Sequence, residues 1–229
     1  MAKRIAFFSL WVGFVTYAFL LAPPDQPDTL PLILDLSSGQ WDGINPLVVA
    51  LFNLMGIWPL IYSCVLFADG RSQRIPVWPF AIASFAVGAF ALLPYLALRQ
   101  SNGQFPGPKH WFIRILDSRW LGGAIALGTI TLLGYGLMNG NWSDFVAQWQ
   151  TSRFIHVMSL DFCLLALLFP ALLGDDLARR GLDRTHPLWL LGWIPLLGPV
   201  AYLCVRPDLI STPETPAQTP QPDVTSPIA

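Results

Sequence analysis

Long apolar blocks are the feature of this sequence that most restricts its fold. Each block of about 18 residues or more, coiled as a helix, is long enough to cross a hydrocarbon core of roughly 30 Å. Hydrophobic residues make up 54% of the 229-residue chain and charged residues only 12%, so little polar surface exists to cover a soluble globule. The sequence therefore predicts an all-α, polytopic membrane helical bundle with lipid as its main partner.

The apolar runs and the breakers between them divide the chain into spans. We expect six transmembrane helices, at 5–22, 46–68, 77–98, 120–138, 154–174 and 187–205. Residues 1–206 then form one transmembrane helical domain. Residues 207–229 are rich in proline and have almost nothing to bury, which predicts a disordered tail.

The distribution of lysine and arginine indicates the orientation of the first half only. Lys3 and Arg4 precede the first span, the next connection has neither residue, and Arg71 and Arg74 follow the second span. This pattern predicts a cytoplasmic N-terminus. With six spans, however, the two sides of the membrane would receive six and seven basic residues, so the whole chain gives no preference.

Two stretches of the sequence are similar to one another. The segment WPLIYSCVLFADGRSQRIPVWPF leads into LLPYLALR, and the segment FPALLGDDLARRGLDRTHPLWLL leads into LLGPVAYLCVR. Each combines a proline-containing span, an Asp/Arg loop and a Pro–Trp re-entry. One hypothesis is a 3+3 duplication with inverted halves, as in several transporter folds. The alternative is convergence, because helical hairpins in lipid tend to acquire basic loops and terminal prolines.

Asp161 is the clearest ionisable residue inside a predicted span, and such groups are costly in hydrocarbon. His156 and Arg153 lie near the same end of that span, but their helical offsets from Asp161 do not support a tight pair. Asn53 in the second span is the favoured partner. A structural Asp–Asn hydrogen bond and a proton or ligand site are the two alternatives.

The paired aspartates Asp175 and Asp176 suggest a magnesium–diphosphate enzyme, but their surroundings do not fit one. In GDDLARRG the spacing is one residue short of the CDP-alcohol phosphotransferase signature, and the later aspartates of that signature are missing. The alternative is a solvated turn in which aspartates balance arginines and tolerate substitution. We expect this second arrangement.

Other kinds of chemistry find little support in the sequence. The three histidines belong to different segments, which does not predict a haem or metal site, and the single glutamate lies in the tail. A phosphate-binding glycine loop and a nucleophile elbow are missing. The net charge of −1 and the lack of a basic stripe argue against nucleic acid. We therefore assign no catalytic residue and no metal, leave any cofactor and its binding residues undetermined, and regard an enzyme as the less favoured class.

Three strings resemble a family of cyanobacterial and chloroplast multi-span membrane proteins whose function is not settled. They are LFNLMGIWPLIYSCVLFADGRSQRIPVWPF, SFAVGAFALLPYLALR and DFCLLALLFPALLGDDLARRG, within roughly residues 45–205. The resemblance implies a photosynthetic membrane, thylakoid or plasma membrane, and transfers no active-site residue because its motifs are structural.

The expected function is a non-catalytic one. We expect contact with membrane complexes, pigments or lipids, in assembly or regulation. The alternative is a transporter of small solutes or ions, indicated by Asp161, by the hypothetical inverted repeat, and by Pro59, Pro94 and Pro170 within spans. An enzyme that acts on lipid or isoprenoid ranks below both.

Overall fold

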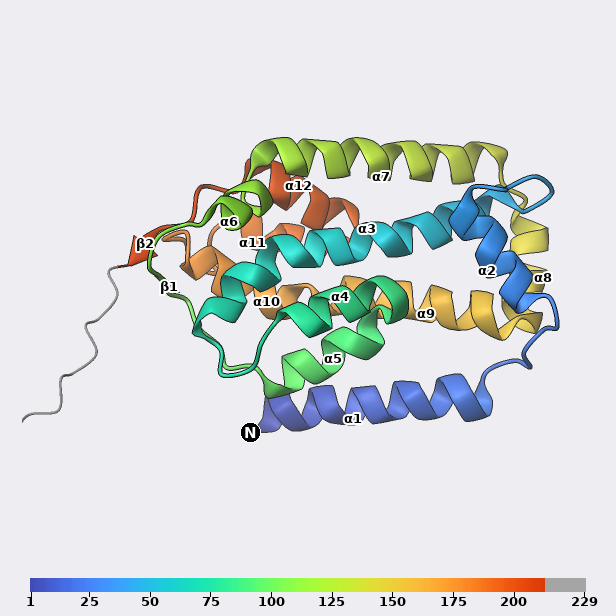
Figure 1. The fold of residues 1–229 in the computed structure, drawn as a ribbon, viewed down its shortest axis with the longest axis horizontal. Helices are drawn as coiled ribbons and strands as arrows, with labels where there is room; N and C mark the ends of the chain where they lie inside the picture. Colours follow the sequence, from blue (N-terminus) through green and yellow to red (C-terminus); the bar gives the residue numbers. More distant parts are fainter. Residues whose placement is uncertain (213–229) are drawn as a thin grey trace, which may run out of the picture.

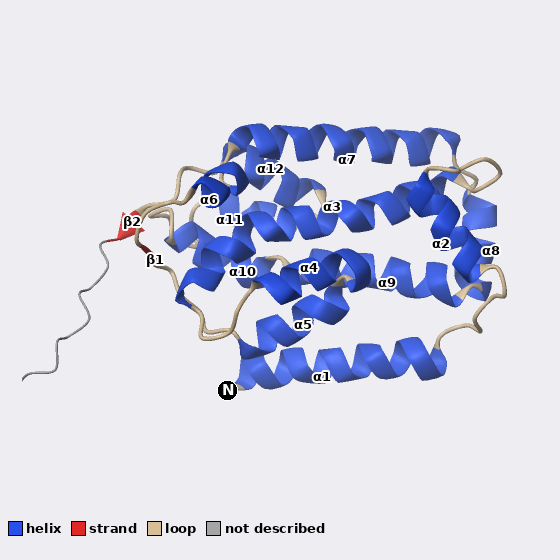
Figure 2. Cartoon of the chain, viewed as in Figure 1, coloured by secondary structure: helices blue, strands red, loops and turns tan. Residues whose placement is uncertain are grey.

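The computed structural model describes residues 1–212, and most of the predicted disordered tail, residues 213–229, lies outside them. The described part is helical apart from one pair of two-residue strands (Figure 2), as the all-α prediction requires. The elements in chain order are α1 (Ala2–Thr16), the π-helix η1 (Tyr17–Leu21), α2 (Thr29–Ser38), α3 (Pro46–Asp69), the 3-10 turn η2 (Gly70–Ser72), α4 (Trp78–Val87), α5 (Ala89–Leu98), β1 (Phe105–Pro106), α6 (Trp111–Leu116), α7 (Arg119–Asn139), α8 (Trp142–Thr151), α9 (Arg153–Leu168), α10 (Pro170–Ala178), α11 (Leu188–Leu191), α12 (Leu197–Val205) and β2 (Ser211–Thr212).

Four helical segments are long and apolar enough to cross a membrane. They are Ala2–Leu21, Pro46–Asp69, Arg119–Asn139 and Arg153–Ala178, with 20 to 26 residues each. At 1.5 Å per residue the shortest spans about 30 Å, the thickness of a hydrocarbon core. These segments correspond to four of the six predicted spans. The membrane-helical character of the chain is thus supported, whereas the count of six is not.

The other two predicted spans, 77–98 and 187–205, are each a pair of shorter helices. Gly88, with φ +49°, separates α4 from α5, and Leu196, with φ 57°, ends the turn before α12. The residues before α4 and after α5 lie next to each other. Gln73 Nε2 donates to the carbonyl of Gln100 at 2.6 Å, and Gln100 N donates to Oε1 of Gln73 at 2.7 Å. Apolar length alone could not distinguish one crossing helix from two half-length helices that turn back.

The second pair returns to its starting point in the same way. Arg180, just after α10, donates from Nη1 to the carbonyl of Pro207, just after α12. The backbone N–H of Ile210 donates to the carbonyl of Arg179 at 2.9 Å. We call α4–α5 the first hairpin and α11–α12 the second hairpin.

The start of the predicted disordered tail is ordered. β2 pairs in parallel with β1, with Phe105 opposite Ser211, and Leu209 is buried against Phe105 and Ile113. The prediction of disorder is wrong for residues 207–212, because they cover the polar end of the bundle and gain backbone hydrogen bonds there.

The long helices lie side by side, with α3 and the α9–α10 segment between α1 and α7 (Figure 1). Both hairpins have their bases at the end of the molecule at which α1 begins. α1 packs on the first hairpin, where Trp11 Nε1 donates to the backbone carbonyl of Phe90 at 3.0 Å and the ring of Phe14 stacks on the ring of Phe90. α7 packs on α3 and α12 through glycine: a Cβ at Gly122 would lie 2.8 Å from the backbone of Leu203.

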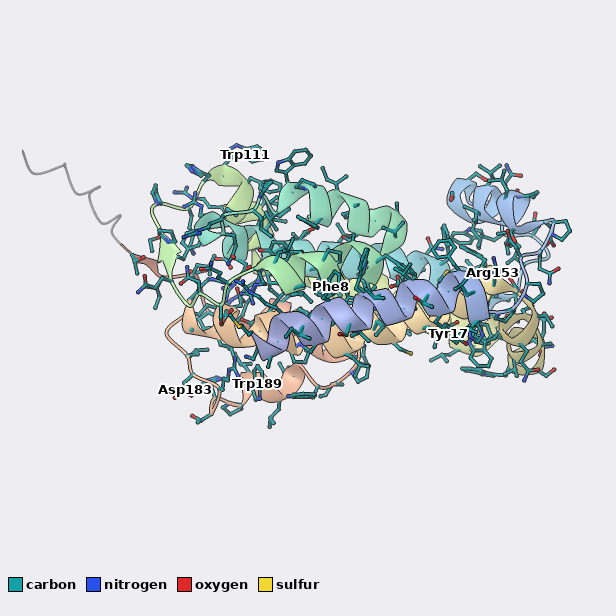
Figure 3. All side chains as sticks on the ribbon, turned by 90° about the horizontal axis from the view of Figure 1, so that it is seen from below. Phe8, Tyr17, Trp111, Arg153, Asp183 and Trp189 are labelled. Atoms are coloured by element: carbon teal, nitrogen blue, oxygen red, sulfur yellow. The ribbon has the colours of Figure 1, made fainter. Side chains whose placement is uncertain are left out.

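The basic residues gather at the end of the bundle where the hairpins enter. Of the 13 lysines and arginines, all of which lie in residues 1–212, Arg153 is at the opposite end, where its Nε donates to the carbonyl of Pro23 (Figure 3). The others lie at the start of α1, in η2 and the loop after it, at the end of α5, between α10 and α11, at the end of α12, or between β1 and the first residue of α7. We call this end of the molecule the basic end.

Candidate functional site

A cavity of about 410 Å³ lies between η1, α3, the tip of the first hairpin and the first half of α9. Most of its lining is apolar and much of it is aromatic, with Phe52, Phe85, Phe90 and Phe154 among the lining side chains. Its volume falls within the range of roughly 300–1,000 Å³ that is typical of small-molecule sites. The cavity therefore has the size and lining of a binding site for a largely apolar molecule.

Asp161 borders this cavity from α9 and contacts the hairpin tip. Its side chain Oδ1 accepts a hydrogen bond from the backbone N–H of Ala89 at 2.8 Å, and the residue is only 4% exposed. Ala89 is the first residue of α5, so the carboxylate satisfies an end N–H and lies at the positive end of the helix dipole. Asp161 thus caps the half-length helix in the bundle interior.

The hairpin tip can approach Asp161 only because residue 88 is glycine. A Cβ at Gly88 would lie 1.7 Å from Oδ2 of Asp161, and the backbone there adopts a positive φ that side chains disfavour. Within residues 1–212 no donor is hydrogen-bonded to Oδ2, and both Asp161 and Gly88 are lining residues of the cavity. One carboxylate oxygen is thus used by the fold and the other is available to a ligand.

Asn53 is not the partner of Asp161, and that prediction is wrong. Its Nδ2 donates at 2.8 Å to the carbonyl of Val49, one turn earlier on the same helix. The donor to Asp161 is instead a backbone N–H at the turn of the first hairpin. The sequence does not reveal this donor, because residues 77–98 have the apolar pattern of one continuous helix, which has no free N–H in its middle.

His156 and Arg153 fix the far end of α1 to α9. The His156 ring stacks on Trp149 with centroids 4.4 Å apart, its Nε2 is 2.8 Å from the Tyr17 hydroxyl, and its Nδ1 is 2.9 Å from the Trp149 carbonyl. Tyr17 begins the π-helical turn of η1. Arg153 lines the cavity together with Asp161, whereas His156 does not. The structure therefore contains no relay through the three residues.

At the basic end, buried aspartates and arginines form a second polar group, which we call the ionic cluster. Its members are Asp69, Asp117, Asp175, Asp176, Arg99, Arg179, Arg180 and Arg206. Asp176 is fully buried and Asp175 nearly so. The prediction that these two aspartates lie in a solvated, tolerant turn is wrong, because residues at the bases of the two hairpins cover them.

The two aspartates bind different partners. Asp175 accepts hydrogen bonds from Arg99 Nη2 and, at 2.6 Å, from the Ser101 hydroxyl. Asp176 accepts from Arg180 Nε at 3.0 Å and from the Tyr202 hydroxyl at 2.6 Å. Their oxygens thus face guanidinium and hydroxyl donors.

Arginine charges are stabilised across the cluster. Burial alone would lower the pKa of Arg180, but Asp176 and Asp117 beside it raise that pKa above its ordinary value. Asp117 also pairs with Lys109 at 3.0 Å. Arg179 pairs with Asp69, and this contact joins the end of α10 to the end of α3. The cluster connects both halves of the chain at one end of the bundle.

The two hairpins contact the cluster through the same pattern of residues. At the base of the first hairpin, the Tyr95 hydroxyl donates to Asp69 at 2.5 Å, and Arg99 pairs with the same carboxylate. At the base of the second, Tyr202 donates to Asp176 at 2.6 Å, and Arg206 lies 3.7 Å from it.

The spacing in the chain is also the same in both hairpins. Each tyrosine follows its aspartate by 26 residues, and each arginine follows its tyrosine by four residues. Sequence reasoning did not single out Asp69, Tyr95 or Arg99, although the repeated Tyr-x-x-x-Arg after an apolar run was a visible signal.

No group of three or more His, Cys, Asp or Glu side chains suited to a metal ion occurs in the part of the chain that the structure describes. Comparisons with family models, with curated proteins and with solved structures gave no match. The resemblance to cyanobacterial and chloroplast membrane proteins therefore stays a hypothesis.

Proposed function

We propose that the chain is a multi-pass membrane protein with four spanning helices and two hairpins that enter the membrane from the cytoplasmic side without crossing it. Helices of ten residues, such as α4 and α5, extend about 15 Å and reach only half of the hydrocarbon core. With this topology all lysines and arginines except Arg153 lie on one side. The conflict in the six-span topology then disappears, and both ends of the described chain are cytoplasmic.

Reporter fusions distinguish this topology from six spans. A fusion at Gly107, after the first hairpin, is cytoplasmic in the proposed topology and lies on the opposite side if 77–98 is a single span. A fusion after η2, at Ser72, is cytoplasmic in both and is the control. An external reporter at Gly107 would rule out the re-entrant hairpin.

We further propose that the chain is a duplication of two parallel halves. The equal spacing of the Asp, Tyr and Arg residues supports duplication. The arrangement of both triads at the basic end supports parallel halves, because inverted halves would place them at opposite ends. Each half then contains two spans and one hairpin.

The function that we propose is non-catalytic binding of a small lipid-soluble molecule in the cavity. The single observation behind it is the aromatic-lined cavity of about 410 Å³ with the available Oδ2 of Asp161 on its wall. From the resemblance alone we propose a thylakoid or plasma membrane as the site of action. A pigment, lipid or isoprenoid bound there would link the protein to the membrane complexes of its surroundings.

A matched pair of glycine substitutions tests this function. Gly56 on α3 lines the cavity, and a Cβ there would meet no atom within 4 Å, so Gly56→Phe should fill the cavity without a backbone clash. Gly123 on α7 is equally open but does not line the cavity, so Gly123→Phe is the control. Protein purified in mild detergent is extracted, and the extract is analysed by absorption and mass spectrometry.

We expect a co-purifying small molecule in the wild type and in Gly123→Phe, with at least a tenfold decrease in Gly56→Phe, as expected for an obstructed site. Equal recovery from all three proteins would show that the molecule binds elsewhere or not at all.

A transporter is the second candidate, and one specific observation favours it. The ionic cluster connects the two halves at the basic end through Arg99–Asp175 and Asp69–Arg179, whereas the cavity lies toward the other end. This is the asymmetry of a transporter closed on one side. Ligand uptake by liposomes that contain the purified protein would support transport, and binding without uptake would favour the non-catalytic function.

A further inference from the structure

We propose that the cavity selects a molecule with a protonated amine on an apolar body, and that the ammonium group pairs with Oδ2 of Asp161. This inference rests on the proposed binding function and assigns a chemical class to the ligand. It depends on the charge of one buried side chain, on the groups around that side chain, and on the access to the cavity.

The carboxylate of Asp161 is only partly compensated by the protein. Its Oδ1 has the N–H of Ala89 and the dipole of α5, but Oδ2 has no donor among residues 1–212. Arg153, the other charged lining residue on α9, precedes Asp161 by about 12 Å along the helix axis. Its Nε is already bonded to the carbonyl of Pro23 at 2.9 Å. A carboxylate in apolar surroundings is costly without a counterion, so a ligand that brings a positive charge gains the most.

Aromatic side chains in the wall also favour a cation. Phe52, Phe85, Phe90 and Phe154 line the same cavity as Asp161. The face of an aromatic ring attracts an ammonium group, and the attraction increases when water is excluded. An anion would be repelled by Asp161, and a neutral alcohol would provide one hydrogen bond without neutralising the carboxylate.

The rim of the cavity allows entry from lipid and from the interface. Phe19 on η1 and Phe85 at the hairpin tip are 67% and 51% exposed, so apolar surface continues from the cavity to the outside. Asp25, after η1, adds a second carboxylate to the lining. An amphipathic amine can therefore approach along the membrane surface and insert its charged group toward Asp161.

Three probes with one body and different head groups test the proposal. They are 4-phenylbutylamine, 4-phenylbutanol and 4-phenylbutyrate, titrated into the full-length protein in nanodiscs by calorimetry. We expect the amine to bind at least about tenfold more tightly than the alcohol, because the ammonium group neutralises the buried carboxylate as well as donating to it, and we expect the acid to bind most weakly.

Two variants locate the origin of the selectivity. Asp161→Asn keeps an oxygen for the Ala89 N–H and should reduce the preference for the amine to about twofold or less, because it lowers the affinity for the amine far more than the affinity for the alcohol. Asp28→Asn removes a nearby exposed carboxylate that does not line the cavity and should keep the preference. If Asp161→Asn does not fold, Gly56→Phe should abolish amine binding with Asp161 intact.

The outcomes separate the two proposals. Equal binding of all three probes, or an amine preference that persists in Asp161→Asn, would overturn the selectivity but leave the binding function. Amine binding that persists in Gly56→Phe would place the site elsewhere. No binding of any probe, together with equal recovery of small molecules from wild type and Gly56→Phe, would overturn the binding function itself.

Discussion

The two hairpins have the same arrangement of residues at their bases and differ at their tips. At the base of each, a tyrosine donates to a buried aspartate and an arginine lies beside that aspartate. At the tip, the first hairpin has Gly88 against the carboxylate of Asp161 and a cavity. The second has Leu196, which is buried in the apolar core.

The difference extends to the helix that each tip faces. Shifting Asp161 back by the separation between Asp69 and Asp176 gives Leu54 on α3, which lies in the same core cluster as Leu196. One half thus has a polar site at the position where the other has packed aliphatic side chains. The bases of the two hairpins are thus alike, whereas a cavity with a buried carboxylate lies at the tip of only one of them.

The largest expected effect is at the shared base. Asp176→Ala should lower the free energy of unfolding by about 3–5 kcal/mol, because the buried Tyr202 hydroxyl would lose its acceptor and the buried Arg180 would lose one of its two carboxylates. Asp69→Ala should cost a similar amount if the bases are equivalent. Thermal unfolding in detergent measures both, and Asp183→Ala on the exposed loop is the control. A large loss in only one of the two aspartate variants would break the equivalence of the bases.

The next largest effect should be at the tip of the first hairpin. Gly88→Ala should destabilise by about 2–3 kcal/mol, because its Cβ would overlap Asp161 and the backbone has a positive φ. The overlap, unlike the backbone strain, should disappear in the double variant with Asp161→Ala. A double-mutant cycle should therefore give a non-additive loss. Additive losses would mean that the tip does not press against the carboxylate.

Removing one hydroxyl from each base should have a smaller effect. Tyr95→Phe and Tyr202→Phe each delete one hydrogen bond to a buried carboxylate, and each should cost about 2 kcal/mol. Denaturation of the two variants under identical conditions measures the loss of unfolding free energy at each base. We expect values within about 0.5 kcal/mol of each other, because each hydroxyl makes the same kind of hydrogen bond to a buried carboxylate. A clear difference would show that one hairpin depends on its base more than the other does.

The smallest effect should come from Asp161 itself. Asp161→Asn should leave stability almost unchanged, since an amide oxygen can still accept from Ala89, whereas Asp161→Leu should cost about 1–2 kcal/mol. Unfolding measurements on both variants test this difference. A loss in Asp161→Asn as large as in Asp161→Leu would mean that the charge, rather than the cap, stabilises the hairpin tip.

The membrane-helical fold followed from the sequence because burial in lipid requires long apolar blocks, and four of them are helices of the expected length. The hairpins could not be predicted, because an apolar stretch has the same composition whether it forms one long helix or two shorter ones. Only backbone conformation, a positive φ at Gly88 and at Leu196, distinguishes them.

For the candidate site, the sequence identified Asp161 because an ionisable residue inside a span is costly and is usually paired or functional. It could not identify a backbone N–H as the partner, because every residue except proline has one. The burial of Asp175 and Asp176 could not be predicted from the sequence either, since a loop of mixed charges has the same composition whether it is solvated or covered by the bases of the hairpins.

The contact between Asp161 and Ala89 has a consequence for the order of folding during synthesis. Ala89 leaves the ribosome 72 residues before Asp161, so the start of α5 has no carboxylate to accept its N–H until α9 has been made. An unsatisfied N–H is costly in hydrocarbon, which favours an interfacial position for the first hairpin during that interval. The insertion of α9 would then draw the hairpin into the bilayer, and the first half of the chain would complete its folding only when the second half arrives.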